Sequence, residues 1–369
     1  MLDPIIAFFQ RVFAAIGRGI GMVVAWFLWP FLAAHGWYRD RSWIIKGPIL
    51  GVLVLLVIFY GQFLYRTQVW HGFDPVFVQA YKFEERTVPA GTALPGEANR
   101  CQDSAIVTVA AALTDQNVNQ NSWISSTLLY KLGFFSLDWD NTPFMDNKAA
   151  FQRGVNQVVR RTAIQLADNL GRVRGTSGIN NDLQSARGNI QFNETTWYFG
   201  TNPFGFKTPT PSYYRSAVSS WNSFNTSLST CESVFDTRSD NLLQLLDGMA
   251  SDLGNTSDIL RRRSEEFNAG WFDTRADDRF WFSYGQLYAQ YALLQATRTD
   301  FSGVIRDRNL TAIWTEMERQ LQAALRIQPA IISNGSEDGW IMPTHLATMG
   351  FYILRVRSNM VEAQSILDR

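Results

Sequence analysis

The most regular pattern in the chain is an uninterrupted apolar run at 47–65, which reads GPILGVLVLLVIFYGQFLY. Its 19 residues include one Gln and no charged side chain. As an α-helix the run would be ~28 Å long, which matches the hydrocarbon thickness of a bilayer. Trp43 and Lys46 precede it and Arg66 and Trp70 follow it, as is typical of the membrane–water interface. The pattern predicts a membrane-spanning helix at 47–65.

A second apolar stretch, at 19–35, precedes this run and is interrupted by Pro30. Two structures remain open for it. In one, residues 4–35 form an amphipathic helix in the plane of the interface, where Arg11 and Arg18 share a face and reach water. In the other, 19–35 also crosses the bilayer, although its length is at the short limit for a span. The N-terminal part, residues 1–66, is therefore predicted to be a membrane anchor made of one membrane helix or a helical hairpin.

Basic side chains between the two stretches predict the orientation of the anchor. Arg39, Arg41 and Lys46 lie there, whereas only Arg66 lies close on the other side of 47–65. Positive side chains beside a span tend to stay in the cytoplasm. We therefore expect an inner-membrane protein whose main domain lies outside, in the periplasm of a Gram-negative cell. A cleaved signal peptide is disfavoured, because its basic region would be too long and a second apolar run follows at once.

The charge of the chain is balanced overall but unevenly distributed. Residues 1–66 carry six basic and two acidic side chains, and the remainder carries 27 basic and 31 acidic ones. A mildly acidic main domain argues against nucleic acid as a partner, because nucleic-acid binding requires a basic face. The expected partners are instead the lipid bilayer and other envelope proteins or a second copy of the chain.

Two glycine pairs with small-xxx-small spacing occur in the anchor. Gly17 with Gly21 and Gly47 with Gly51 would each allow close approach of two helix backbones. They would pack the hairpin or pair two protomers. The alternative is that glycine is simply common in membrane helices.

The remaining residues are expected to be mainly α-helical. Residues 67–100 contain three Pro and three Gly and predict an extended connector that leaves the membrane. Apolar positions at 3–4 spacing then predict a soluble antiparallel helical bundle with long loops over 101–369. The expected helices are 104–114, 121–135, 146–170, 212–231, 240–267, 276–299, 309–327 and 343–367, with an irregular stretch at 190–211.

Three segments carry a resemblance to a known family. They are SWIIKGPILG at 42–51, DNLGRVRGTSGINNDLQSARGNIQF at 168–192 and PFGFKTPTPSYYRSA at 203–217. The sequence resembles the DUF2333 family of uncharacterised bacterial envelope proteins over most of its length. The resemblance implies a proteobacterial inner-membrane protein. It implies no activity, and no catalytic residue is carried over from it.

Cys101 and Cys231 are the only cysteines. In an oxidising periplasm they could form a structural disulfide that closes a loop of ~130 residues, and the loop-entropy model values such a bond at roughly 4–5 kcal/mol. Two separate buried thiols are the alternative. Neither a CxxC motif nor a neighbouring His supports metal binding by this pair.

Other candidate chemistry is weak. Arg172 and Arg174 lie in the glycine-rich segment GRVRGTSG and could bind an anion, although a helix end with solvated arginines is the simpler interpretation. His345 is the one histidine placed to act as a base in the main domain, but a packed or capping histidine is more common. No cofactor or catalytic motif is recognised.

Asp273, Asp277 and Asp278 suggest a calcium site, but their spacing does not fit an EF-hand and basic residues are interleaved with them. They are interpreted as the acidic first turn of a helix. The aromatic-rich helix predicted at 276–299 is interpreted as core.

The leading hypothesis is therefore an envelope scaffold that contacts other proteins. The alternative is an envelope enzyme, or a lipid- or glycan-binding protein that uses the aromatic helix.

Overall fold

The computed structural model describes residues 3–134, 137–142, 144–172, 178–267, 269–336 and 342–369. The chain divides into two compact units, residues 1–62 and residues 63–369. The protein is mainly α-helical, which confirms the predicted fold class. Helices are joined by long loops and two short antiparallel hairpins.

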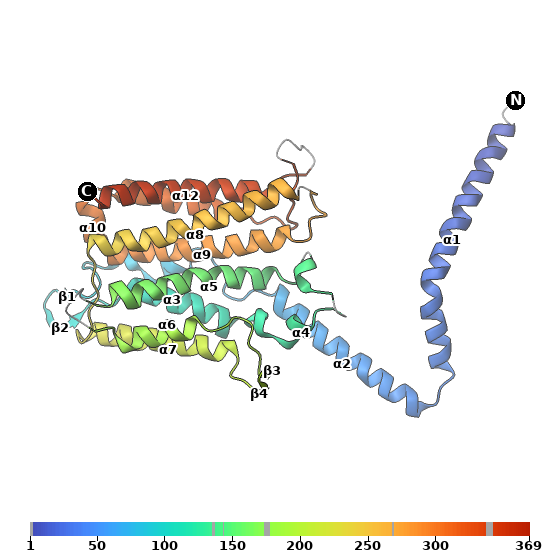
Figure 1. Cartoon of the computed structure of the whole chain (residues 1–369), viewed down its shortest axis with the longest axis horizontal. Helices are drawn as coiled ribbons and strands as arrows, with labels where there is room; N and C mark the ends of the chain where they lie inside the picture. Colours follow the sequence, from blue (N-terminus) through green and yellow to red (C-terminus); the bar gives the residue numbers. More distant parts are fainter. Residues whose placement is uncertain (1–2, 135–136, 143, 173–177, 268, 337–341) are drawn as a thin grey trace. The chain divides into compact units, whose positions relative to one another are not determined.

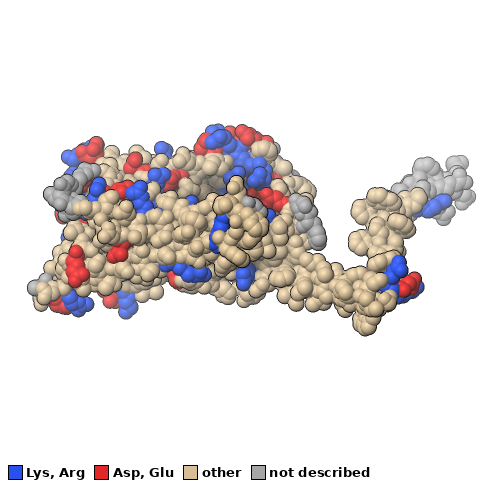
Figure 2. Space-filling model, turned by 60° about the horizontal axis from the view of Figure 1, so that its bottom comes forward, with Lys and Arg blue, Asp and Glu red and all other residues tan. Residues whose placement is uncertain are grey.

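The N-terminal unit is helical. Helix α1 (Asp3–Arg39) runs without a break through Pro30, and α2 (Trp43–Gln68) continues beyond the unit boundary. Both helices are long and apolar enough to cross a membrane. Figure 2 shows their described surface as almost entirely uncharged. Because their large apolar side chains are exposed, this surface is suited to lipid and not to water.

The four glycines of the small-xxx-small pairs lie within these helices. No atom of the described chain lies within 4 Å of a Cβ built on Gly17, Gly21, Gly47 or Gly51. Their role in helix packing, within a hairpin or between two protomers, therefore stays a prediction.

The second unit, called the body here, is a bundle of helices whose axes lie nearly along one direction (Figure 1). Its helices are α3 (Ala105–Asp115), α4 (Leu128–Leu132), α5 (Asn147–Gln165), α6 (Asn181–Ile190), α7 (Thr210–Ser229), α8 (Ser239–Glu266), α9 (Ala276–Asp300), α10 (Ser302–Asp307), α11 (Thr311–Leu325) and α12 (His345–Leu367).

Three of these helices differ from the prediction, of which α10 lies between two expected helices and was not predicted. Among the described residues 121–134, only those of α4 are α-helical, because Thr127 begins a new helix with extended backbone after the 3-10 turn Ile124–Ser126. Helix α6 was missed, although Asn180 caps it by accepting the backbone N–H groups of Asp182 and Leu183. The glycine-rich segment before Asn180 indicates a helix end, so the sequence pattern did not predict a new helix directly after it.

Helices α5 and α9 lie against each other in the middle of the bundle and run in the same direction (Figure 1). They touch through their backbones. A Cβ on Gly154 of α5 would collide with the carbonyl oxygen of Phe282, and a Cβ on Gly285 of α9 would collide with that of Phe151. The two glycines are therefore required for the separation of the helices. The parallel pair differs from a purely antiparallel bundle and brings two helix N-termini to the same end.

The segment between α2 and α3, predicted as an extended connector, is instead packed against the body. It contains the 3-10 turns Phe77–Tyr81 and Phe83–Glu85 and the hairpin of β1 (Ala93–Leu94) and β2 (Glu97–Cys101). Val78 and Phe83 are buried, and Phe73 stacks on Tyr288 of α9 at 5.5 Å between ring centroids. Its prolines and glycines place turns, while its aromatic residues supply the burial that an extended connector would lack.

The two ends of the bundle differ in what they carry. The end into which α2 runs also carries α4, the α8–α9 turn and the hairpin of β3 (Phe199–Thr201) and β4 (Phe204–Phe206), and is called the junction end (Figure 1). The opposite end carries β1, β2, α10 and the C-terminus, and is called the far end (Figure 1).

Gly154→Ala tests the contact between α5 and α9. The added methyl group has no space beside the Phe282 carbonyl, so we expect the full chain in detergent to lose on the order of 1–3 kcal/mol of unfolding free energy, or more. Gly188→Ala is the matched control, because Gly188 lies in α6 with nothing within 4 Å of the added methyl. The control should be neutral or stabilising by up to about 1 kcal/mol. Equal effects of the two substitutions in denaturant titrations would contradict the contact.

Candidate functional site

The last turns of α2 form part of the core of the body. Phe63 and Thr67 are 3% and 1% exposed, and the Phe63 ring lies 5.0 Å from the ring of Trp139. Just beyond α2, Trp70 packs against Phe151 of α5 and Trp281 of α9, with ring centroids 5.0 and 5.1 Å apart. The helix that leads to the N-terminal unit therefore ends among the side chains of the central helix pair.

Lys148, in the first turn of α5, completes the end of α2. Its Nζ donates hydrogen bonds to the carbonyl oxygens of Arg66 and Val69, at 2.9 and 2.7 Å. A cation at this position satisfies carbonyls that have no partner within their own helix and interacts favourably with the negative end of the helix dipole. Burial lowers the pKa of Lys148 to about 8.

Four carboxylates gather beside this junction, where the N-termini of α5 and α9 meet. One carboxylate oxygen from each of Asp140, Asp146 and Asp278 lies within 4.8 Å of the other two. Asp277 is buried next to them in the first turn of α9. This acidic cluster contains two of the three residues considered for calcium, whereas Asp273 forms an ion pair with Arg263 and accepts a hydrogen bond from Asn334.

Two members of the acidic cluster lack hydrogen-bond donors. Asp146 is fully buried, Asp277 is 4% exposed, and none of their four carboxylate oxygens has a partner among the described residues. Burial, with the neighbouring Asp278 carboxyl as a further cause, raises the pKa of Asp146 far above its ordinary range. Burial and then the charge of Asp278 raise the pKa of Asp277 to about 7.

Asp140 and Asp278 connect the acidic cluster to its surroundings. The hydroxyl of Tyr130 donates a hydrogen bond of 2.9 Å to Asp140, and Arg275 lies 3.8 Å from the other oxygen of the same carboxylate. Asp278 is partly exposed, so the cluster is open to solvent on one side. Such a site can retain a proton or bind a hard cation through oxygen ligands.

A surface cavity of about 410 Å³ lies beside the end of α2, where Thr67 and Gln68 form part of its lining. Its apolar wall comes from Trp70, Phe73 and Trp281, and Gln68 and Asn147 supply amide groups. Most other aromatic residues of the predicted 276–299 helix are in the core, as Phe280, Tyr284 and Tyr288 are at most 1% exposed, whereas Phe282 is partly exposed. Trp281 is therefore the residue of this helix that could contact a ligand in this cavity.

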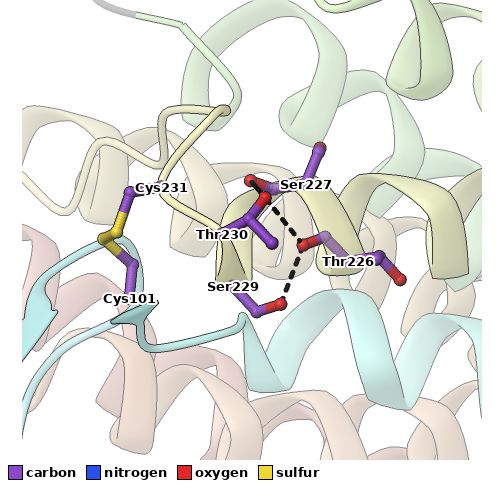
Figure 3. The surroundings of a disulfide bond; sticks show 6 residues. All are labelled: Cys101, Thr226, Ser227, Ser229, Thr230 and Cys231. Carbon is purple, nitrogen blue, oxygen red and sulfur yellow. Dashed lines mark hydrogen bonds between the residues drawn. A yellow bond between two sulfur atoms is a disulfide. The ribbon is translucent and has the colours of Figure 1, made fainter. Parts of the chain in front are cut away.

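Cys101 and Cys231 are joined by a disulfide, with their Cα atoms 5.3 Å apart (Figure 3). The bond links the end of β2 to the loop after α7, at the far end of the bundle. Beside it, the hydroxyls of Ser229 and Thr230 donate to carbonyl oxygens of the last turn of α7 (Figure 3). The disulfide and the acidic cluster therefore occupy opposite ends of the body.

The remaining sequence candidates lie apart from the acidic cluster. Arg172 donates from Nε to the carbonyl oxygen of Asp168 and so closes the end of α5 and its terminal turn, while Arg174 lies outside the described residues. The anion site at these two residues stays a prediction. His345 accepts the Ser333 N–H at Nδ1, and burial lowers its pKa, as expected of a packed histidine.

Comparison with known proteins gives one match. The model of the family described as "Uncharacterized protein conserved in bacteria (DUF2333)" matches residues 94–269 and 261–369. No curated protein and no solved structure matches the chain. The matched region includes Asp140, Asp146, Asp277 and Asp278, as well as both cysteines.

The acidic cluster predicts a pH-dependent stability when a chelator removes divalent cations. The pKa of Asp277 is about 7 in the folded chain and ~3.9 when unfolded, so the folded state holds an extra proton between these values. The free energy of unfolding should therefore fall as pH rises from about 4 to about 7, by roughly 1–4 kcal/mol. Asp277→Asn should flatten this fall in denaturant titrations of the full chain. A wild-type profile that is unchanged by the substitution would contradict this prediction.

Proposed function

The chain belongs to the DUF2333 family of uncharacterised bacterial proteins, and we propose that it is a membrane-anchored envelope scaffold with its body in the periplasm. The observation that carries the proposal is the construction of the junction. A helix apolar enough to cross a membrane continues without a loop into the core of a folded body. Such a joint attaches the body to the apolar helix through continuous backbone, as a protein that presents its body to neighbouring proteins requires.

The periplasmic placement is supported by two independent features. Arg39, Arg41 and Lys46 favour the cytoplasmic side for the stretch between α1 and α2. The Cys101–Cys231 disulfide is a bond that forms and persists in oxidising compartments. Both features favour an inner-membrane protein whose body is outside the cytoplasm.

The partner surface that we propose is the β3–β4 hairpin. Phe204 and Phe206 are 80% and 93% exposed, and the preceding Tyr198 is 61% exposed. The two strands pair only with each other, with Phe199 opposite Phe206 and Thr201 opposite Phe204. A hairpin with exposed aromatic rings is costly in water, and aromatic residues are enriched at protein interfaces. A neighbouring envelope protein that covers the rings would remove this cost.

A second function, binding of a lipid or glycan, is favoured by the cavity beside the α2 terminus. Its volume of about 410 Å³ lies within the range of small-molecule sites, and it combines aromatic walls with two amide side chains. The residue from the aromatic-rich helix that would contact such a ligand is Trp281.

The orientation predicts the result of a reporter fusion. An enzyme that is active only in the periplasm should be active when it is fused after Arg369. The same reporter inserted after Ser42, between α1 and α2, should be inactive, because that stretch is expected to be cytoplasmic. Activity only at the Ser42 insertion would overturn the periplasmic placement.

Site-specific photocrosslinking in intact membranes tests the scaffold function. A photoreactive phenylalanine analogue at Phe206 should crosslink to a second protein chain. The matched control is Val234, which is 44% exposed but lies near the disulfide at the far end. We expect it to give at least about tenfold less protein adduct.

Mass spectrometry of the adducts separates the candidate functions. Adducts with lipid alone at Phe206 would contradict the scaffold function and would show that the hairpin touches the bilayer. A small-molecule or lipid adduct specific to a probe at Trp281 would favour the second function.

A further inference from the structure

Asp146 has an unusual role for a residue at its position. It is the N-cap residue of α5, where an aspartate commonly accepts a backbone N–H from the first turn. Its side chain forms no capping hydrogen bond and is fully buried. One of its oxygens instead lies within 4.8 Å of carboxylate oxygens of Asp140 and Asp278. The carboxylate thus faces two other carboxylates and does not cap its helix.

The acidic cluster carries more carboxylates than there are basic groups beside it. Asp140, Asp146, Asp277 and Asp278 supply four carboxylates. Two guanidinium groups are close by, that of Arg275 at 3.8 Å from Asp140 and that of Arg153, which donates to the hydroxyl of Tyr130. Ionised carboxylates would therefore exceed the guanidinium groups by two. Buried charge of this kind is paired, protonated or bound to a metal.

We propose that the carboxylates of Asp140, Asp146 and Asp278 bind one divalent cation, with calcium as the preferred ion. Calcium–oxygen distances of about 2.3–2.6 Å allow two ligands of one ion to lie up to ~5 Å apart, which accommodates the observed separation. Magnesium–oxygen distances of about 2.0–2.1 Å would require the three carboxylates to contract and to adopt octahedral geometry. Ligands made only of carboxylate oxygen favour such hard cations over zinc or copper.

Neighbouring side chains already orient the proposed ligands. Tyr130 donates to Asp140 at 2.9 Å, and Arg153 donates to Tyr130 at 2.6 Å and to Ser125 at 3.0 Å. Hydrogen bonds of this kind hold ligating carboxylates in place. The partial exposure of Asp278 and Asp140 leaves a route for the ion from solvent.

The ion would join three parts of the body. Asp140 lies in the 3-10 turn Trp139–Asn141, Asp146 begins α5, and Asp278 is in the first turn of α9. Trp139 of the same turn packs against Phe63 of α2. A bound cation would therefore fasten the turn that holds the end of α2 to the central helix pair.

Calcium-dependent unfolding of the full chain in detergent tests this site. We expect 1 mM Ca²⁺ to raise the unfolding temperature by about 3 °C or more relative to chelator, with a smaller effect of 1 mM Mg²⁺. Tb³⁺ bound at the site should show luminescence sensitised by Trp139, the residue next to Asp140, and Ca²⁺ should displace it.

Three variants assign the effect to the proposed ligands. Asp146→Asn and Asp278→Asn should each abolish the Ca²⁺-induced shift and weaken Tb³⁺ binding at least tenfold. Asp307→Asn, which changes an exposed carboxylate in α10, should behave as wild type. Because Asp278 is partly exposed, its variant keeps the test decisive if Asp146→Asn does not fold.

Two results would overturn the proposal. One is a wild-type chain whose unfolding temperature is the same in Ca²⁺ and in chelator, as expected if Asp146 and Asp278 share only a proton. The other is a Ca²⁺-induced shift of equal size in all three variants, which would mean that ions bind elsewhere on the acidic surface.

Discussion

The direct backbone contact of α5 and α9 determines most of what is distinctive in this body. Gly154 and Gly285 remove the side chains that would otherwise separate the two helices, and each faces a carbonyl oxygen of the other helix. Because the helices are parallel, their N-termini meet at the junction end (Figure 1). Two positive helix ends at one point favour acidic side chains there. The acidic cluster therefore follows from the direction of two helices as much as from the identity of its residues.

The same helix pair receives the end of α2. Trp70 lies between Phe151 and Trp281, which belong to α5 and α9, and Lys148 on α5 closes the exposed carbonyls at the end of α2. The core of the body, the end of α2 and the acidic cluster therefore all depend on the placement of α5 and α9. A substitution that destabilises one of them should therefore also change the stability of the other two, because residues in contact are energetically coupled.

Local patterns were enough to predict most of the long helices but not their arrangement. The apolar run at 47–65 and the 3–4 spacing in α5, α8 and α12 are visible along the chain, and the structure has helices in these places. The acidic cluster was hidden because Asp140 and Asp146 are more than 130 residues from Asp278. Asp146, Asp277 and Asp278 also occupy positions where acidic residues are expected for helix starts alone. Only the tertiary structure reveals that Asp146 does not cap its helix.

The disulfide has a mechanical consequence that follows from its position in the chain. A force on α2 directed away from the body would first detach the segment at 69–100 from the helices that it packs against. This segment ends at Cys101, which is covalently linked to Cys231. Tension would then pass through the sulfur atoms to the loop before α8 and bypass α3 to α7, which lie between the two cysteines in sequence. The segment at 69–100 could extend by up to ~3.5 Å per residue, and the bond would stop the extension there. The disulfide at the far end of the bundle thus limits how far the chain can be extended by a force applied through α2.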